Sequence, residues 1–263
     1  MNDQVAQNKR RSLVLTVAFG AVIAVVIAVV LALVGLGLVG LAIALVVGAA
    51  AAFARYRTSD AAVLRLSGAV EADPARHARL HNLVEGLCIA SGLPKPRLYV
   101  IDDAAPNAFA IGRSPQHAAI AVTTGLLDKL NRVELEAVLA HELSHVKSGD
   151  ILVATLAVTM VGFVPLPAPE RSRLVQLAVS PGRAARADVS AVEMTRYPPG
   201  LIAALEKLRD DPTVVRAGSP AMAHLWIEAP VPSADAEGRA AGGDRDADAH
   251  PPIEDRIAAL RER

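Results

Sequence analysis

His141-Glu142-Leu143-Ser144-His145 is the most informative stretch of this chain. If it is helical, the two histidines stand at i and i+4, so one helix face aims both imidazoles at a single point, as in zinc sites. Glu142 follows the first histidine directly and would lie where a carboxylate can take a proton from an attacking water. The pattern predicts a zinc hydrolase, most often a peptidase. A histidine pair on a partly buried helix without metal stays open as the alternative.

The flanking residues indicate that this stretch is indeed helical. Asn131 and Glu134 have the spacing of a capping box, in which each side chain bonds the other's backbone N–H. Apolar residues recur at helical spacing from Val133 to Leu143. Gly149 supplies a stop. We therefore expect a helix between Asn131 and Gly149.

Composition sets the frame for the rest of the chain. Its 263 residues are 52% hydrophobic and only 3% aromatic, enough for one sizeable soluble domain plus membrane segments. The net charge is zero, so no nucleic-acid-binding footprint is visible. Cys88 is the only cysteine, which excludes an internal disulfide and fits a reducing compartment.

The N-terminal region carries a long apolar segment. Residues 13–54 contain no charged side chain, and roughly 20 helical residues cross a bilayer core once. Three glycines between residues 35 and 40 mark a turn near the middle, so the segment predicts two transmembrane helices at about 13–33 and 37–54. One long helix is the competing interpretation, but its outer half would expose an apolar surface to water on all sides.

Positive charges flank both ends of this hairpin. Lys9, Arg10 and Arg11 precede it, and Arg55 and Arg57 follow it. The positive-inside rule therefore places both flanks, and the domain that follows, in the cytoplasm. We expect a multi-pass protein of the cell (inner) membrane.

After the hairpin the pattern is typical of an α+β domain. Residues 73–91 are expected to form a helix that ends before Gly92. Three short β-capable runs then follow at Arg97–Ile101, Ala108–Ile111 and Ala118–Val122, separated by turn residues. They predict a small sheet laid against the helix that carries the two histidines.

The chain thus divides into a series of predicted units. A segment rich in Ala, Gly, Asp and Ser separates the domain from a last helix and is typical of a flexible linker. The units are a cytoplasmic N-terminus (1–12), the hairpin (13–54), the catalytic domain (55–231), the linker (232–249) and a C-terminal helix of the domain (250–263).

The motifs, taken in order, resemble those of the HtpX-type membrane zinc metallopeptidases, relatives of the enzymes that cleave prenylated CAAX proteins. The resemblance covers most of the chain. It rests on Pro106–Ala110, Ala121–Leu127, His141–Val146, Ala187-Asp188, Leu201–Leu208 and His250–Ile257.

This resemblance implies a gluzincin site in which His141 and His145 bind zinc and Glu142 is the catalytic base. The family's third ligand is a glutamate four residues before an Asp, and here Ala184 stands four residues before Asp188. A methyl group cannot coordinate zinc. The family's Asp is expected to orient a histidine ligand, and Asp188 could alternatively replace the missing ligand, because it lies one turn further along the same helix face.

The resemblance also implies where substrate binds. An edge strand containing Asn107, Ala108 and Phe109 would pair with an extended peptide through main-chain hydrogen bonds. An ordinary turn and strand is the alternative. His250 matches a histidine of the family's C-terminal motif that helps near the active site; without the resemblance, it would simply precede a helix start.

The segment between the two halves of the site departs from the family. Relatives commonly carry a second hydrophobic hairpin there, but the apolar run Ile151–Val164 is too short for an ordinary span and a proline-rich stretch interrupts it. We expect Ile151–Val179 to be a buried or interfacial helix beside the membrane surface.

These observations predict a cytoplasm-facing, membrane-anchored, zinc-dependent endopeptidase. Its partners would be protein or peptide substrates, including membrane proteins, and the lipid bilayer, with no nucleic acid. Its role, by resemblance, is membrane-protein quality control. The rival hypothesis is a catalytically impaired homologue that keeps the fold and binds partners or peptides without cutting them. Ala184 favours the rival, and the intact His-Glu-x-x-His favours the enzyme.

Overall fold

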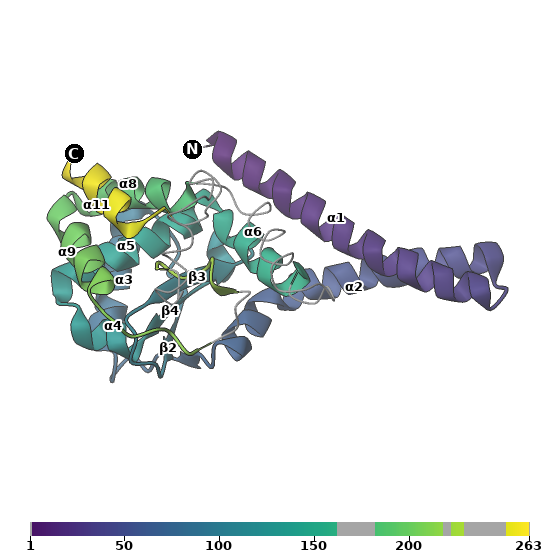
Figure 1. Ribbon diagram of the computed structural model, residues 1–263, viewed down its shortest axis with the longest axis horizontal. Coiled ribbons are helices and arrows are strands. Elements are labelled where there is room, and N and C mark those ends of the chain that lie inside the picture. The colour runs from purple at the N-terminus through teal and green to yellow at the C-terminus, as the bar shows by residue number, and fades with distance from the viewer. Residues whose placement is uncertain (1, 162–181, 218–221, 229–250, 263) are drawn as a thin grey trace.

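A long helical hairpin projects from a domain built of helices around a small sheet (Figure 1). This computed structural model describes residues 2–161, 182–217, 222–228 and 251–262. The expected α+β class is confirmed, with two N-terminal apolar helices and a mixed four-stranded sheet.

The hairpin consists of α1 (Asn2–Leu33) and α2 (Gly37–Leu66). The turn between them uses Gly35 and Gly37 at positive φ, which glycine adopts without strain. Further along, a Cβ on Gly48 would come within 2.6 Å of the Gly20 carbonyl oxygen, so small residues allow the two helices to pack closely. Both helices are long and apolar enough to cross a membrane, and most of their large side chains face outward.

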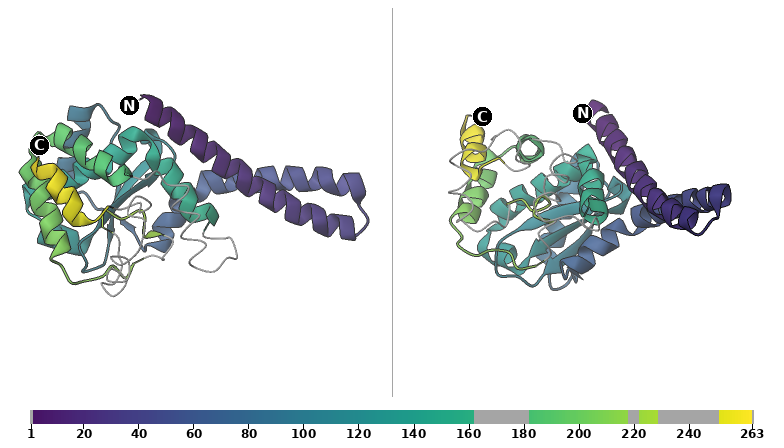
Figure 2. Two further views of the ribbon diagram at one scale, coloured as in Figure 1. Left: turned by 45° about the horizontal axis from the view of Figure 1, so that its top comes forward. Right: turned by 45° about the vertical axis from the view of Figure 1, so that its right-hand side comes forward.

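The second helix continues beyond the apolar segment. The predicted boundary at residue 54 falls inside α2, whose last turns bury Ser59, Val63 and Leu64 against the domain. The N-terminal part of α1 returns to the same domain, where the Asn8 side-chain amide donates to the Ser148 carbonyl at 3.2 Å. Both ends of the hairpin therefore lie beside the domain (Figure 2).

The sheet has the strand order β1-β2-β4-β3. The three predicted strands are confirmed as β2 (Arg97–Ile101), β3 (Ala108–Gly112) and β4 (Ala118–Thr123). Strand β2 runs parallel to β4, whereas β3 pairs antiparallel with it, with Ala110 opposite Ile120. The two-residue β1 (Val70–Glu71), which sequence reasoning missed, adds the other edge. Strand β3 is consequently an edge strand.

Alternation along the strands divides the core between the two faces of the sheet. Ala108, Ala110 and their neighbours on β4 pack with α3 (Ala78–Ser91) and α5 (Arg132–Ser148). Phe109 lies on the opposite face, in a cluster with the end of α2 and Trp226.

The first helix of the domain is shorter than expected. Residues 73–91 were predicted to be helical, but α3 begins at Ala78. The Asp73 carboxylate accepts hydrogen bonds from the backbone N–H groups of Ala75 and Arg76 at 2.9 and 2.8 Å. These local bonds favour a turn over the first helical turn.

The helix with the two histidines, α5, has the predicted ends. The Asn131 side chain accepts from the backbone of Val133 and Glu134, and the Glu134 carboxylate accepts from the Asn131 N–H at 2.8 Å. Gly149 ends the helix at φ 70°, in the left-handed region that favours glycine. The cap therefore determines where α5 begins, and with it the placement of the histidines.

Replacing this cap gives the first prediction. We expect Asn131→Ala to lower the free energy of unfolding by about 1 kcal/mol, because two backbone N–H groups lose their acceptor. Thermal unfolding of the detergent-solubilised protein would measure the change. Arg132→Ala, the matched control one residue later, keeps the cap. Equal effects of the two substitutions would contradict this role for Asn131.

The remaining elements complete the site. The segment after α5 forms α6 (Asp150–Leu156), with Ile151, Ala154 and Leu156 buried, followed by a π-helical turn at Ala157–Val161. This agrees with a buried helix at the start of Ile151–Val179; residues 162–181 and the predicted linker lie outside the described residues. The other helices are α4 (Thr124–Lys129), the short 3-10 turn η1 (Pro115–His117), α8 (Arg183–Thr195), α9 (Pro198–Arg209) and α11 (Ile253–Arg261).

Candidate metal centre

Helix α5 brings the two histidine rings together as its i, i+4 spacing requires. The Nε2 atoms of His141 and His145 lie 3.3 Å apart, and the ring planes cross at 83°. Both side chains are almost fully buried. Two ring nitrogens therefore converge on one point within the domain.

Each histidine is held from its other ring nitrogen by a carboxylate. His141 Nδ1 lies 2.8 Å from Asp188 Oδ1, and His145 Nδ1 lies 2.9 Å from Asp150 Oδ2. A carboxylate can only accept, so Nδ1 carries the proton and Nε2 keeps its lone pair. Carboxylates hold metal-binding histidines in this way.

Asp188 is in turn fixed by a buried arginine. Arg256 on α11 donates from Nε to Asp188 Oδ2 and from Nη2 to Oδ1, both at 2.8 Å. Its Nη1 donates to the Ile227 carbonyl at 2.7 Å. The bidentate pair connects α11 to α8, and the bond to Ile227 connects α11 to the segment around that residue. Asp188 is therefore left with little freedom to move.

The Asp150 carboxylate has a looser partner. Arg183 Nε stands 3.6 Å from Asp150 Oδ2, while Arg183 Nη1 donates to the His224 carbonyl at 3.0 Å. Burial would raise the pKa of Asp150, but the His145 imidazole, which donates to this carboxylate, and the positive charge of Arg183 outweigh burial and hold the pKa at about 2. Asp150 is therefore ionised at neutral pH and keeps its hold on His145.

Glu142 is fully buried, and no group in the described residues hydrogen-bonds either of its carboxylate oxygens. Burial raises the pKa of Glu142 to about 8, and the positive charge of Arg183 only partly offsets this. An unsatisfied buried carboxylate is costly. Such a group is expected where a ligand or a cation completes the environment.

The histidines are neutral at physiological pH. Burial lowers the pKa of His141 to about 4, although the nearby Asp188 carboxylate opposes the shift. Burial also lowers the pKa of His145, against the effect of Asp150. Metal binding requires neutral imidazole, so neither ring has to lose a proton to bind a cation.

These features fit a zinc ion on two counts and fail on a third. Two neutral histidines converge, and the orphaned carboxylate of Glu142 lies beside them in sequence. However, Ala184 is buried one helical turn before Asp188, and the described ranges hold no cluster of three or more His, Cys, Asp or Glu side chains able to hold a metal. The part of the chain that the structure describes therefore supplies two candidate zinc ligands, whereas a catalytic site normally has three protein ligands.

The proposed substrate strand is partly occupied by the chain itself. The Asn107 carbonyl accepts a hydrogen bond from the Thr123 N–H, so the main-chain groups of Asn107 face β4. In an antiparallel pair this direction alternates, so from Ala108 on every second residue of β3 turns its main-chain groups to the free edge of the sheet. Ala108 there accepts from the Ile227 N–H at 2.9 Å, and the Asn107 side chain donates to the Glu228 carbonyl at 2.8 Å.

The next residue in the predicted strand points away from this edge. The Phe109 side chain is fully buried and makes an edge-to-face contact with Trp226, with ring centroids 4.8 Å apart. Ala110, two residues beyond Ala108, lies beside Glu142: its backbone N–H helps to lower the pKa of that carboxyl, although it forms no hydrogen bond with it. His250 lies outside the described residues.

Sequence reasoning missed Asp150, Arg183 and Arg256. Asp150 directly follows Gly149, the residue that ends the helix with the two histidines. This position was the signal in the sequence that could have indicated a contact between Asp150 and His145. Arg256 lies within the C-terminal motif, but nothing in its neighbours indicates a partner 68 residues away.

Comparisons with known proteins cover most of the chain. Residues 74–263 match the profile described as Peptidase family M48. The chain is 36% identical to "Protease HtpX homolog" of Dictyoglomus turgidum over 258 residues, covering 86% of this chain and 83% of that protein. A protein of the same name from Dictyoglomus thermophilum is 33% identical, and the match covers 98% of this chain and 93% of that protein. Another from Streptococcus pneumoniae (strain Hungary19A-6) is 34% identical, and the match covers 99% of each chain.

Proposed function

The chain belongs to peptidase family M48, and from this premise we propose that it is a membrane-anchored, zinc-dependent endopeptidase that hydrolyses peptide bonds in proteins. The observation that carries the proposal is the pair of neutral histidines whose Nε2 atoms converge while buried carboxylates hold both Nδ1 atoms. A histidine pair kept only for packing has no need of two buried orienting charges.

His141 and His145 would hold the zinc. When bound, the metal would polarise the scissile carbonyl and stabilise the negative charge that develops on its oxygen. Glu142 takes the proton from the attacking water and passes it to the leaving amine. With a pKa of about 8, Glu142 is mostly protonated at neutral pH without a cation beside it, and a cation held by the two histidines would lower that pKa and ionise the carboxyl. The ionised, buried carboxylate is then a stronger base than one in water.

Asp188 and Asp150 are positioning residues for His141 and His145. In this role they keep each ring in the tautomer with Nε2 free. For Asp188 to serve instead as the third ligand, it would have to leave both His141 and the bidentate contact with Arg256. We therefore assign it the orienting role.

Substrate would extend along the open edge of β3. Main-chain pairing of this kind is independent of side-chain identity, as an endopeptidase of broad specificity requires. Asn107 and Ala108 would shape one end of the groove through their bonds to Glu228 and Ile227. Ala110, beside Glu142, is the residue of β3 at which the scissile bond would lie. Phe109 would support the strand from behind, and His250 would contribute from the C-terminal motif.

The membrane arrangement follows from the hairpin. Helices α1 and α2 would cross the bilayer twice, with the basic flanks and the peptidase domain in the cytoplasm. An active site held close to the membrane surface fits cleavage of misfolded or surplus membrane proteins, and hence a role in quality control.

One observation favours a second candidate function, a catalytically impaired homologue that binds peptides or partners. Ala184 is buried, and it stands at the position where the resemblance implies a glutamate ligand. Loss of a carboxylate that only orients a ligand typically lowers metal affinity about 10–100-fold, and loss of a direct ligand costs at least that much. The two candidates differ in whether the chain as it stands retains zinc.

Zinc content decides between them. We expect the purified, detergent-solubilised protein to bind about one zinc ion per chain and His145→Ala to lose it, since a zinc site needs both histidines. Ala184→Glu should tighten binding at least about tenfold. Ala185→Glu, one residue later on an exposed part of the same helix, is the matched control and should change nothing. Zinc that appears only with Ala184→Glu would instead establish a disabled site and a binding role.

A further inference from the structure

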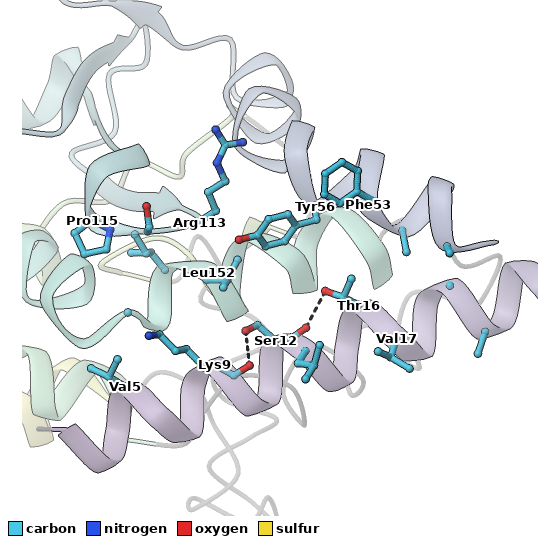
Figure 3. Close-up of a pocket in the computed structure, with 18 of the residues that line it drawn as sticks. Val5, Lys9, Ser12, Thr16, Val17, Phe53, Tyr56, Arg113, Pro115 and Leu152 are labelled. Carbon is cyan, nitrogen blue, oxygen red and sulfur yellow. Dashed lines mark hydrogen bonds between the residues drawn. The ribbon is translucent and has the colours of Figure 1, made fainter. Parts of the chain in front are cut away.

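A groove lies between the hairpin and the peptidase domain (Figure 3). Its volume is about 1100 Å³. Helices α1 and α2 form two walls, and residues 113–116 with the start of α6 close the end that faces the domain. It is separate from the histidine pair.

The groove is apolar over most of its length. Leu13 and Val17 of α1 face Leu45, Ala49 and Phe53 of α2 across it. All five belong to the charge-free segment of the hairpin. This part of the groove therefore lies at the depth of the lipid hydrocarbon, where it suits an acyl chain.

The end of the groove near the domain is polar and positively charged. Lys9 and Lys147 line it, and the Tyr56 hydroxyl points inward in Figure 3. Arg113 lines the same end, with Nη1 donating to the Arg57 carbonyl at 2.8 Å. Among the described residues, the groove lining contains no Asp or Glu, and no carboxylate forms an ion pair with Lys9 or Lys147.

We propose that this groove binds one anionic glycerophospholipid. An acyl chain occupies the apolar part between α1 and α2, and the phosphate lies between Lys9 and Lys147 with the Tyr56 hydroxyl as a further donor. Charge complementarity selects this occupant. The cations stand where the charge-free segment ends, which is the level of the headgroups, and cationic side chains near that surface attract anionic lipids.

A bound lipid has a structural consequence. Helix α1 contacts the domain through its N-terminal turns, and the lipid would fill the space between that contact and the α1–α2 interface. Lys147 belongs to α5, two residues after His145, so the headgroup would also link the membrane surface to the helix of the active site.

Native mass spectrometry tests the proposal on the full-length protein, delipidated and then reconstituted in nanodiscs of phosphatidylcholine with phosphatidylglycerol. We expect one phosphatidylglycerol molecule to stay bound after release from the nanodisc. Each cation near an anionic surface strengthens binding about fivefold, so Lys9→Gln with Lys147→Gln should weaken retention on the order of 25-fold.

The matched control removes the same charge at the same membrane level. Arg10→Gln with Arg11→Gln alters the basic flank of α1 at residues that do not line the groove, and it should leave retention unchanged. An equal loss in both double variants would reduce the effect to general surface attraction and overturn the proposal. Equal retention of phosphatidylcholine would overturn the selectivity for an anionic headgroup.

Photo-crosslinking distinguishes a lipid from a transmembrane segment of another protein. A benzoylphenylalanine at position 17 faces the groove, while one at position 25, an exposed residue of α1 outside the groove lining, reports bulk lipid. We expect the adduct at position 17 to have phospholipid mass and to be richer in phosphatidylglycerol than the adduct at position 25. A polypeptide adduct at position 17, or identical lipid composition at both positions, would contradict the assignment.

Discussion

Glu142→Gln is expected to abolish peptide cleavage while leaving zinc binding intact. The substitution keeps the shape of the side chain but removes the only proton acceptor that we assign to the reaction. General base catalysis contributes about 10²–10⁴-fold to such reactions, so the loss of rate should fall at least in that range. The rate is measured as cleavage of an unfolded membrane-protein substrate in detergent or nanodiscs.

The environment of Glu142 makes this experiment informative. Its carboxylate is fully buried without a hydrogen-bond partner among the described residues, so its replacement by an amide would not break a bond that supports the fold. The thermal unfolding temperature should therefore be at least that of the parent. Glu136→Gln, on the same helix and partly exposed, is the matched control and should cleave normally. Unchanged cleavage by Glu142→Gln would refute the proposed mechanism.

The features predicted correctly from the sequence are those encoded by nearby residues. The capping box, the glycine stop of α5 and the three strands each depend on contacts or patterns within a few positions. The convergence of His141 and His145 is likewise a property of one helix. Local signals sufficed for the backbone of the site.

Features that depend on distant residues were not predictable in the same way. The hold of Asp150 on His145 depends on how the chain turns at Gly149, and the pairing of Arg256 with Asp188 requires α11 to pack against α8. The start of α3 was also wrong, because the side chain of Asp73 captures the backbone of the expected first turn. Hydrophobic periodicity does not report such polar contacts.

The strand predicted to bind substrate shows a further limit of sequence reasoning. Its edge position follows from the strand order, which the alternation of side chains does not specify. The segment around Ile227, far away in sequence, already bonds to Ala108. The open part of the edge is consequently displaced toward Ala110, beside Glu142.

The pair between Arg256 and Asp188 leads to the second large expected effect. Arg256→Met should lower the free energy of unfolding by about 3–5 kcal/mol, because it leaves a buried carboxylate without its charge partner. Both side chains are at most 3% exposed, so solvent cannot compensate. The Ile227 carbonyl loses its donor as well, which loosens the segment that contacts β3.

Thermal unfolding measures this effect against a matched control on the same helix. Arg261→Met also removes an ion pair, with Glu206, but that pair is exposed and should contribute less than about 1 kcal/mol. Combining Arg256→Met with Asp188→Leu also removes the buried carboxylate that Arg256→Met leaves without a charge partner, so part of the stability should be recovered. In the same combined variant His141 loses the carboxylate that orients it. If Arg256→Met were no more destabilising than Arg261→Met, the buried pair would not be what holds α11 to α8. If the combined variant instead recovers stability but not zinc binding, Asp188 has two separate roles. One is to neutralise Arg256, and the other is to hold His141.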